Sequence, residues 1–179
     1  FIYQEIELSE GEGHDAGHNH GSQLQFGARW DNYSIVSRTG DPKFGPGRTT
    51  DFSNASGSVG LSYSVTEVVT VSGSVARAFR APTVEELYSN AFHAAAGTYD
   101  VGNAALEAET STGAEAILRV GGARVTAQFS AYVNRVANYV TPDIVGDTLV
   151  DAELVPLNRF TQADAQLSGL EAMLETRLG

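Results

Sequence analysis

The sequence of 179 residues contains no cysteine. Neither a disulfide nor a thiolate metal site can therefore form within it. Basic residues are scarce, because 11 lysines and arginines stand against 22 aspartates and glutamates, and the formal net charge is -11. Nucleic acid is not an expected partner, since binding a phosphate backbone depends on basic patches.

Long apolar runs and proline are also lacking. No stretch of about 18 apolar residues occurs, so no transmembrane helix is expected. No signal peptide is visible, and the chain opens at Phe1 in strand-like sequence. Proline occurs 5 times and glycine 19 times, which favours a β-rich protein over a helical one. The length is enough for one ordinary domain.

Alternation of apolar and polar residues is the strongest structural pattern. From residue 124 to 134 it continues without exception. Successive side chains of a strand point to opposite faces, so the pattern predicts one apolar and one polar face. A change of phase near Gly169 suggests a β-bulge. The expected strands are residues 1–8, 24–33, 56–65, 69–79, 110–120, 124–134 and 163–178.

The alternation alone is compatible with a soluble β-sandwich and with a membrane β-barrel. The segments run about ten residues, the length that a tilted strand needs to cross the hydrocarbon of a membrane. Short connections at 66–68 and 121–123 alternate with long ones at 34–52, 78–110 and 140–162. Short turns on one side and long loops on the other favour the barrel.

The longest connection, from Ala78 to Thr110, contains a helix start signal. Pro82 cannot pair inside a sheet and holds the preceding residue extended. Thr83 followed by Glu86 fits a capping box, which predicts a short helix from 84 to 89. Taken locally, these residues are only a signal that stops the strand and starts a helix.

Several segments resemble the TonB-dependent outer-membrane receptors. Phe79–Tyr88 resembles one family signature, and Gly97–Asn103 followed by Leu106–Thr110 resembles two more. Ala104 and Ala108 stand where the family has prolines, so this turn is expected to be less rigid. Further resemblances to strand ends of the family lie at Tyr132–Arg135, Phe160–Ala165 and Gly169–Glu171. Their order and spacing cover nearly the whole chain from Leu24 onward.

The resemblance implies an all-β fold, an antiparallel transmembrane β-barrel of 22 strands closed by a plug. Residues 1–179 would be a portion of the barrel domain with about seven strands, and the plug domain and terminal strands would be absent. An open seven-stranded sheet cannot sit in lipid, because its edges leave backbone groups unpaired. The implied location is the bacterial outer membrane. The implied partners are its lipid and a TonB complex, which is contacted through the missing plug portion.

Three of the four histidines lie in a glycine-rich tract between the first two expected strands. His14, Asp15, His18 and His20 offer imidazole and carboxylate ligands that suit zinc, copper or nickel. A solvated turn that binds nothing specific explains the same composition. Strand directions counted from the long loops place the tract on the periplasmic side. It resembles histidine-rich segments of the zinc-uptake branch of the family.

The fourth histidine, His93, lies in the long external connection. Residues 89–93 also resemble the zinc-uptake branch, in which a loop histidine faces the metal, although His93 taken alone is more simply a surface imidazole. The resemblance implies import of a scarce nutrient, with zinc or another divalent metal as the substrate and no cofactor required. The candidate substrate-binding residues are His93, Arg80 and Tyr99, and the candidate metal ligands are His14, Asp15, His18, His20 and His93.

Three alternatives remain open. A siderophore, haem or cobalamin receptor should use aromatic and basic loop residues such as Arg80, Tyr99 and Arg159. A passive or adhesive barrel is permitted by the negative charge and the polar faces. An enzyme is not expected, because no G-x-S-x-G element is present and His93 could be oriented by Asp100 only by an accident of folding. No catalytic residue is therefore predicted.

Overall fold

The computed structural model describes residues 1–8 and 21–177. Nine strands and one short helix make up the described part, and the strands form a single sheet. The helix α1 (Val84–Tyr88) and the short strands lie in the longest connection. The strands are β1 (Ile2–Leu8), β2 (Ser22–Ser37), β3 (Arg48–Thr66), β4 (Val69–Arg80), β5 (Asn90–His93), β6 (Thr98–Val101), β7 (Glu109–Gly121), β8 (Val125–Val150) and β9 (Glu153–Thr176).

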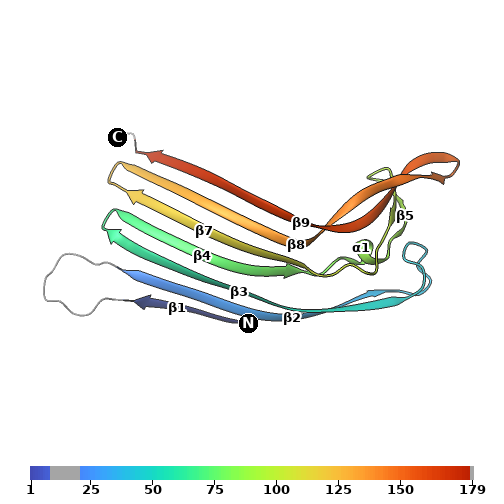
Figure 1. Ribbon diagram of the computed structural model, residues 1–179, viewed down its shortest axis with the longest axis horizontal. Coiled ribbons are helices and arrows are strands. Elements are labelled where there is room, and N and C mark those ends of the chain that lie inside the picture. The colour runs from blue at the N-terminus through green and yellow to red at the C-terminus, as the bar shows by residue number, and fades with distance from the viewer. Residues whose placement is uncertain (9–20, 178–179) are drawn as a thin grey trace.

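The strand order is β1-β2-β3-β4-β7-β8-β9-β6-β5, and only the β6–β9 pair is parallel among the described strands. The seven long strands match the seven predicted ones, and β5 and β6 are additional. The β3–β4 and β7–β8 turns gather at one end of the sheet, and α1, β5 and the β8–β9 hairpin gather at the other (Figure 1). The predicted separation of short turns and longer connections is confirmed.

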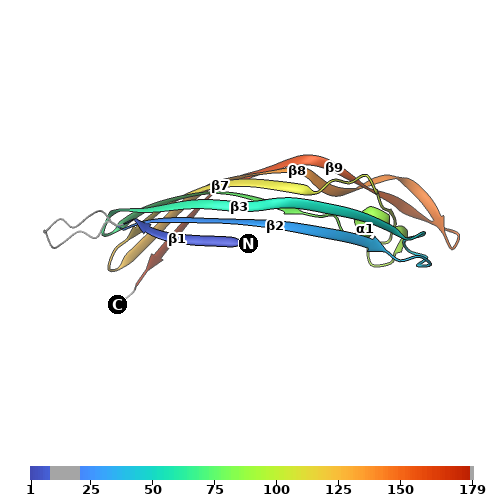
Figure 2. The ribbon, with the colours of Figure 1, turned by 90° about the horizontal axis from the view of Figure 1, so that it is seen from below.

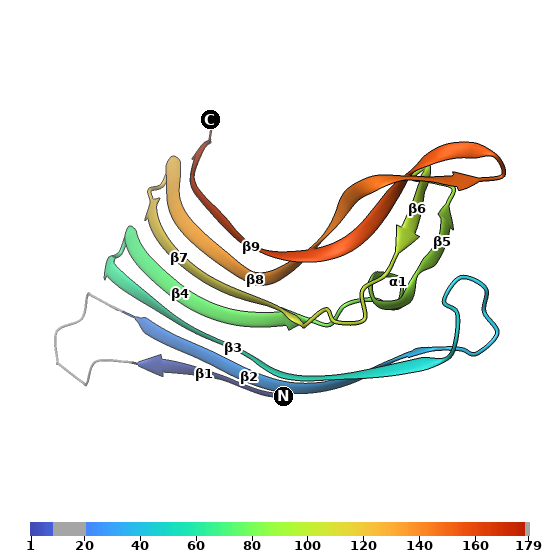
Figure 3. The same ribbon diagram turned by 45° about the vertical axis from the view of Figure 1, so that its right-hand side comes forward.

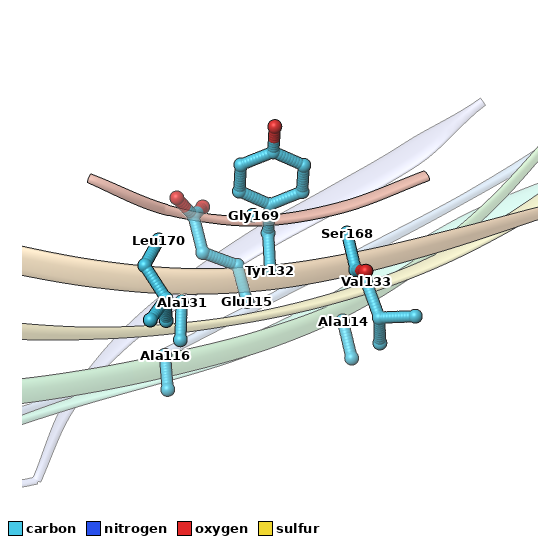
Figure 4. A pocket seen from close by; sticks show the side chains of 9 residues that line it. All are labelled: Ala114, Glu115, Ala116, Ala131, Tyr132, Val133, Ser168, Gly169 and Leu170. Atoms are coloured by element: carbon cyan, nitrogen blue, oxygen red, sulfur yellow. The ribbon is translucent and has the colours of Figure 1, made fainter. Parts of the chain in front are cut away.

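The sheet is one curved layer (Figure 2). Register places Ala114 beside Val133 on one face and Glu115 beside Tyr132 on the other. Figure 4 shows the side chains of these two pairs pointing in opposite directions from the sheet. The apolar face is open, and Leu170 there is 84% exposed. Within the described residues no second sheet covers this face, so the sandwich alternative is wrong.

Two connections predicted to be long loops are largely strand. In the first, β2 continues to Ser37 and β3 begins at Arg48; in the second, β8 continues to Val150 and β9 begins at Glu153. Both extensions lose the alternation that marks the middle of the sheet, which is why the pattern did not reveal them. They remain rich in threonine, valine, isoleucine and phenylalanine, the residues that fit a pleated strand.

The β-bulge predicted near Gly169 is wrong. Pairing of β8 with β9 is regular through Tyr132 and Gly169, and the register shifts instead between Val136 and Tyr139 and between Ile144 and Gly146. A Cβ at Gly169 would lie 2.6 Å from the Tyr132 hydroxyl oxygen, so the tyrosine ring occupies the space that the glycine leaves. Leu167 caused the apparent change of phase, because it lies on the polar face and is 57% exposed.

The buried apolar residues gather at the loop end, where α1 lies between the extensions of β2–β3 and β8–β9 (Figure 3). Thr83 caps the helix, and its capping box with Glu86 is formed as predicted. The part of the chain that the structure describes has no helix with the length and hydropathy of a membrane span. The fully or largely buried members of this cluster are Leu87, Tyr88, Leu106 and Val140.

The β8–β9 turn predicts a stabilising substitution. Asp151 and Ala152 join the strands with φ of 49° and 68°, a left-handed conformation that costs an alanine about 1–2 kcal/mol. Ala152→Gly should stabilise the hairpin by up to about 1 kcal/mol and slow its amide hydrogen exchange. Ala165→Gly, inside β9, is the control and should accelerate exchange. Faster exchange in Ala152→Gly would contradict the prediction.

Candidate functional site at the loop end of the sheet

Arg80 joins the end of β4 to two carboxylates. Its cross-strand partner in β7 is Glu109, which accepts from Nε at 2.8 Å and from Nη2 at 2.6 Å. Glu86 in α1 accepts from Nη1 at 2.8 Å and from Nη2 at 3.1 Å. Paired contacts of this kind fix the planar guanidinium in both distance and orientation. We call Arg80, Glu86 and Glu109 the arginine clamp.

Each carboxylate of the arginine clamp also holds a backbone N–H. Glu86 Oε2 accepts from Thr83 N at 2.7 Å, and Glu109 Oε1 accepts from Val140 N at 2.7 Å. The clamp thereby connects β4, the start of α1, β7 and β8. Arg80 was a candidate substrate-binding residue, and its Nε, Nη1 and Nη2 atoms all donate within the protein. A substrate role for Arg80 stays a prediction, whereas its structural role is explicit.

Removing the clamp cation should loosen the loop selectively. In Arg80→Met, Glu109, which is 8% exposed in the parent protein, loses its charged partner, at a cost on the order of 1–3 kcal/mol. Hydrogen exchange of residues 83–89 should accelerate while that of β3 is unchanged. Lys43→Ala is the control, because its 3.4 Å pair with Glu85 is half exposed and should contribute less than about 1 kcal/mol. Equal effects of the two variants would refute this assignment.

The second family-like segment packs directly on the helix. Gly102 N donates to Ser89 O at 2.7 Å, and Asn103 N donates to Glu86 O at 2.8 Å. The Asn103 side-chain amide also reaches Phe160 O, at 3.3 Å, in β9. A Cβ at Gly102 would lie 2.5–2.7 Å from backbone atoms of Leu87 and Tyr88, so only glycine fits there.

Gly102→Ala should therefore displace α1. The clashing atoms are backbone, which cannot rotate away, and overpacking of this kind costs about 1–3 kcal/mol. Limited proteolysis of the folded protein should show new cleavage between residues 81 and 108. Gly121→Ala is the matched control, since no atom lies within 4 Å of its added Cβ. An identical proteolytic pattern in the two variants would contradict the packing argument.

The β5–β6 hairpin brings His93 and Asp100 together. His93 Nδ1 lies 3.0 Å from Asp100 Oδ2, and the imidazole is 57% exposed. Asp100 is only 7% exposed, and its Oδ1 accepts from Thr98 Oγ1 at 2.7 Å and Asn158 Nδ2 at 3.1 Å. Burial alone would raise the pKa of Asp100, but the hydrogen bonds from Thr98, Asn158 and His93 outweigh it and hold the pKa below its usual value.

A cavity of about 310 Å³ lies beside this pair. His93 and Phe92 contribute from β5, and Lys43 and Glu85 contribute from the β2–β3 connection and from α1. Phe160 of β9 completes a wall that is part aromatic and part charged. The cavity therefore presents an imidazole, an ammonium group and a carboxylate at the loop end of the sheet.

The other predicted binding residues have different surroundings. The Tyr99 hydroxyl donates to Asn90 O at 3.0 Å and so ties β6 to β5, and its substrate role stays a prediction. His14, Asp15, His18 and His20 lie outside the described residues. Among the described residues, no three histidine, aspartate or glutamate side chains are grouped as a metal site.

Sequence reasoning missed several members of the site. Asp100 lies inside a segment singled out for its resemblance, but it was considered an orienting partner of His93 only by accident of folding. Asn158 and Phe160 join the site through the parallel pairing of β6 with β9, in which Asp100 is opposite Asn158. Lys43 belongs to the β2–β3 connection, and its backbone oxygen accepts from Asn90 N at 2.8 Å. No local pattern predicts these distant contacts.

The family model for TonB-dependent receptor-like β-barrels matches residues 20–179. The chain belongs to this family. It is thereby an outer-membrane protein of the kind found in Gram-negative bacteria, and the sheet is part of a larger barrel wall. The sequence-based identification of the family and of the fold class is confirmed.

Solved structures of similar fold include one transporter and two receptors. The copper transporter OprC has a TM-score of 0.67 and 18% identity, over 99% of this chain and 26% of its own. The siderophore receptor PirA of Pseudomonas aeruginosa has a TM-score of 0.58 and 22% identity, over 95% of this chain and 38% of its own. The third structure is a double mutant of the haemophore receptor HasR of Serratia marcescens, in complex with its haemophore HasA and haem. It has a TM-score of 0.56 and 17% identity, over 88% of this chain and 29% of its own. At these identities the likeness shows the fold alone, and the chain spans well under half of each relative.

Proposed function

We propose that this chain is part of a TonB-dependent receptor that actively imports a scarce metal, with zinc as the first candidate. The observation that carries the proposal is His93, an exposed imidazole on the wall of a cavity at the loop end, backed by a buried carboxylate. A carboxylate on the second ring nitrogen is the usual companion of a metal-binding histidine. The exposed ring is accessible to a metal that arrives from outside.

The proposal assigns the two ends of the sheet different tasks. His93 captures metal at the loop end, and the tract with His14, His18 and His20 holds metal after passage. Leu8 pairs with Ser22, so the strand ends that flank the tract lie at the end of the short turns, away from His93. The proposed assembly also includes lipid against the open apolar face, and a plug domain that contacts TonB. Residues 1–179 supply a portion of the barrel domain.

A second candidate substrate is a metal chelate, such as a siderophore, haem or cobalamin complex. The printed names of PirA and HasR, which denote siderophore and haemophore receptors, support this candidate. The single imidazole supports it too, because a metal that arrives inside a chelator needs few ligands from the protein. The names of these relatives, receptors and a transporter, also support a role without catalysis.

Growth under metal limitation separates the two candidates. A strain that depends on the full receptor should be rescued by zinc, and His93→Ala should reduce zinc uptake several-fold because a capture ligand is lost. Replacing His14, His18 and His20 by alanine should lower zinc uptake without lowering capture at the cell surface. Ala95→Ser, an exposed substitution in the same connection, is the control and should be neutral.

Rescue of growth by an iron chelate but not by zinc would favour the metal chelate over zinc as the substrate. Uptake and surface binding of zinc that are unchanged in both histidine variants would refute the roles given to His93 and the tract. Radioactive zinc measures both quantities on whole cells, and immunoblots of outer-membrane fractions show that each variant is present at equal amounts.

A further inference from the structure

The two oxygens of Asp100 have different hydrogen-bond partners. Oδ1 accepts from the Thr98 hydroxyl at 2.7 Å and from the Asn158 amide at 3.1 Å, and Oδ2 faces His93 Nδ1 at 3.0 Å. A carboxylate can only accept, so the proton in the third contact lies on His93 Nδ1. A neutral imidazole carries one N–H, and Nε2 therefore keeps its lone pair.

The position of Asp100 depends on the docking of the hairpin. β6 pairs with β9 in parallel, with Asp100 opposite Asn158. Asn158 is 8% exposed, so its amide lies inside the contact between the hairpin and β9. Separation of the hairpin from β9 would remove the Asn158 donor from Asp100 and expose the carboxylate to water. The orientation of His93 is thereby linked to the folded state of the loop.

We infer that Asp100 is a positioning residue, which holds the neutral His93 ring in the tautomer whose Nε2 lone pair can bind a metal while the β5–β6 hairpin is docked on β9. This inference rests on the proposed function, since it concerns the same imidazole. It adds a residue that does not touch the metal and a conformational condition for binding. Substituting a residue that hydrogen-bonds a metal-binding histidine typically lowers metal affinity by about 10–100-fold.

The substitution Asp100→Asn tests the inference with almost no change in shape. Thr98 and Asn158 both donate to one oxygen, so the carbonyl oxygen of the new amide is fixed on their side. Its NH₂ group then faces His93 and donates to Nδ1, which moves the ring proton to Nε2. The isosteric control Thr98→Val removes one donor to Oδ1 but leaves the contact between Asp100 and His93 in place.

Two measurements on the full receptor in detergent decide the outcome. Nitrogen NMR of histidine-labelled receptor, with the His93 signal assigned by its loss in His93→Ala, should show Nδ1 protonated in the parent and in Thr98→Val. It should show Nε2 protonated in Asp100→Asn. Calorimetric titration with Zn²⁺, in receptors whose His14, His18 and His20 are replaced, should show affinity about 10–100-fold lower in Asp100→Asn. Hydrogen exchange of β6 shows whether this variant keeps its fold.

Failure of the inference and failure of the proposed function give different results. Protonated Nδ1 in a folded Asp100→Asn, or zinc affinity within twofold of the parent, overturns the inference even where His93→Ala abolishes binding. Zinc affinity that is unchanged in His93→Ala overturns the ligand role of His93, and with it both proposals at this site. A folded Asp100→Asn variant that shows both the inverted tautomer and the weakened affinity supports the inference.

Discussion

The loop end of this barrel segment depends on one guanidinium group held between two carboxylates. Arg80 lies where β4 leaves the sheet, and Glu86 and Glu109 approach it from the helix and from the next long strand. Each carboxylate also accepts a hydrogen bond from a backbone N–H. The cation therefore fixes the direction in which the chain continues after β4. The helix then buries Leu87 and Tyr88, although the sheet itself is a single layer with few buried side chains. The apolar cluster and the cavity wall both follow from that placement.

Glu85, Asp100 and Phe160 line the cavity and belong to family-like segments, whereas Lys43 lies outside them. Arg80, Glu86 and Gly102 belong to family-like segments, and each is occupied with contacts inside the protein. His93 lies between Glu86 and Gly102 in the chain, at the end of β5. Arg80, Glu86 and Gly102 therefore support the loop end, and the exposed imidazole of His93 is positioned on that support.

The sequence predicted the structures that depend on neighbouring residues, which are the long strands and the start of the helix. Alternation found the seven long strands, because the middle of the sheet has one apolar and one polar face. The pair Thr83 and Glu86 found the helix start, because a capping box is formed within four residues. The strand extensions beyond Val140 were missed where the alternation stops. The contact of Asp100 with Asn158 was also missed, because a parallel pairing between a loop hairpin and a distant strand leaves no periodic trace. His93 was selected through resemblance, and its orienting partner became visible only in the folded hairpin.

Asn158 shows what the hairpin contact costs. Its side-chain Oδ1 is buried and has no hydrogen-bond partner in the described part of the chain, a loss of about 1–3 kcal/mol. An apolar residue at this position would remove that loss but would also take a donor from Asp100, which is itself buried. A buried carboxylate that lacks a hydrogen-bond donor is the more costly of the two defects. Burying an unpaired charge costs more than burying an unpaired amide oxygen. The unpartnered oxygen is thus tolerated because the other end of the same amide supports the carboxylate that orients His93. Docking on β9 and orientation of the imidazole are consequently parts of one hydrogen-bond arrangement, in which neither is complete without the other.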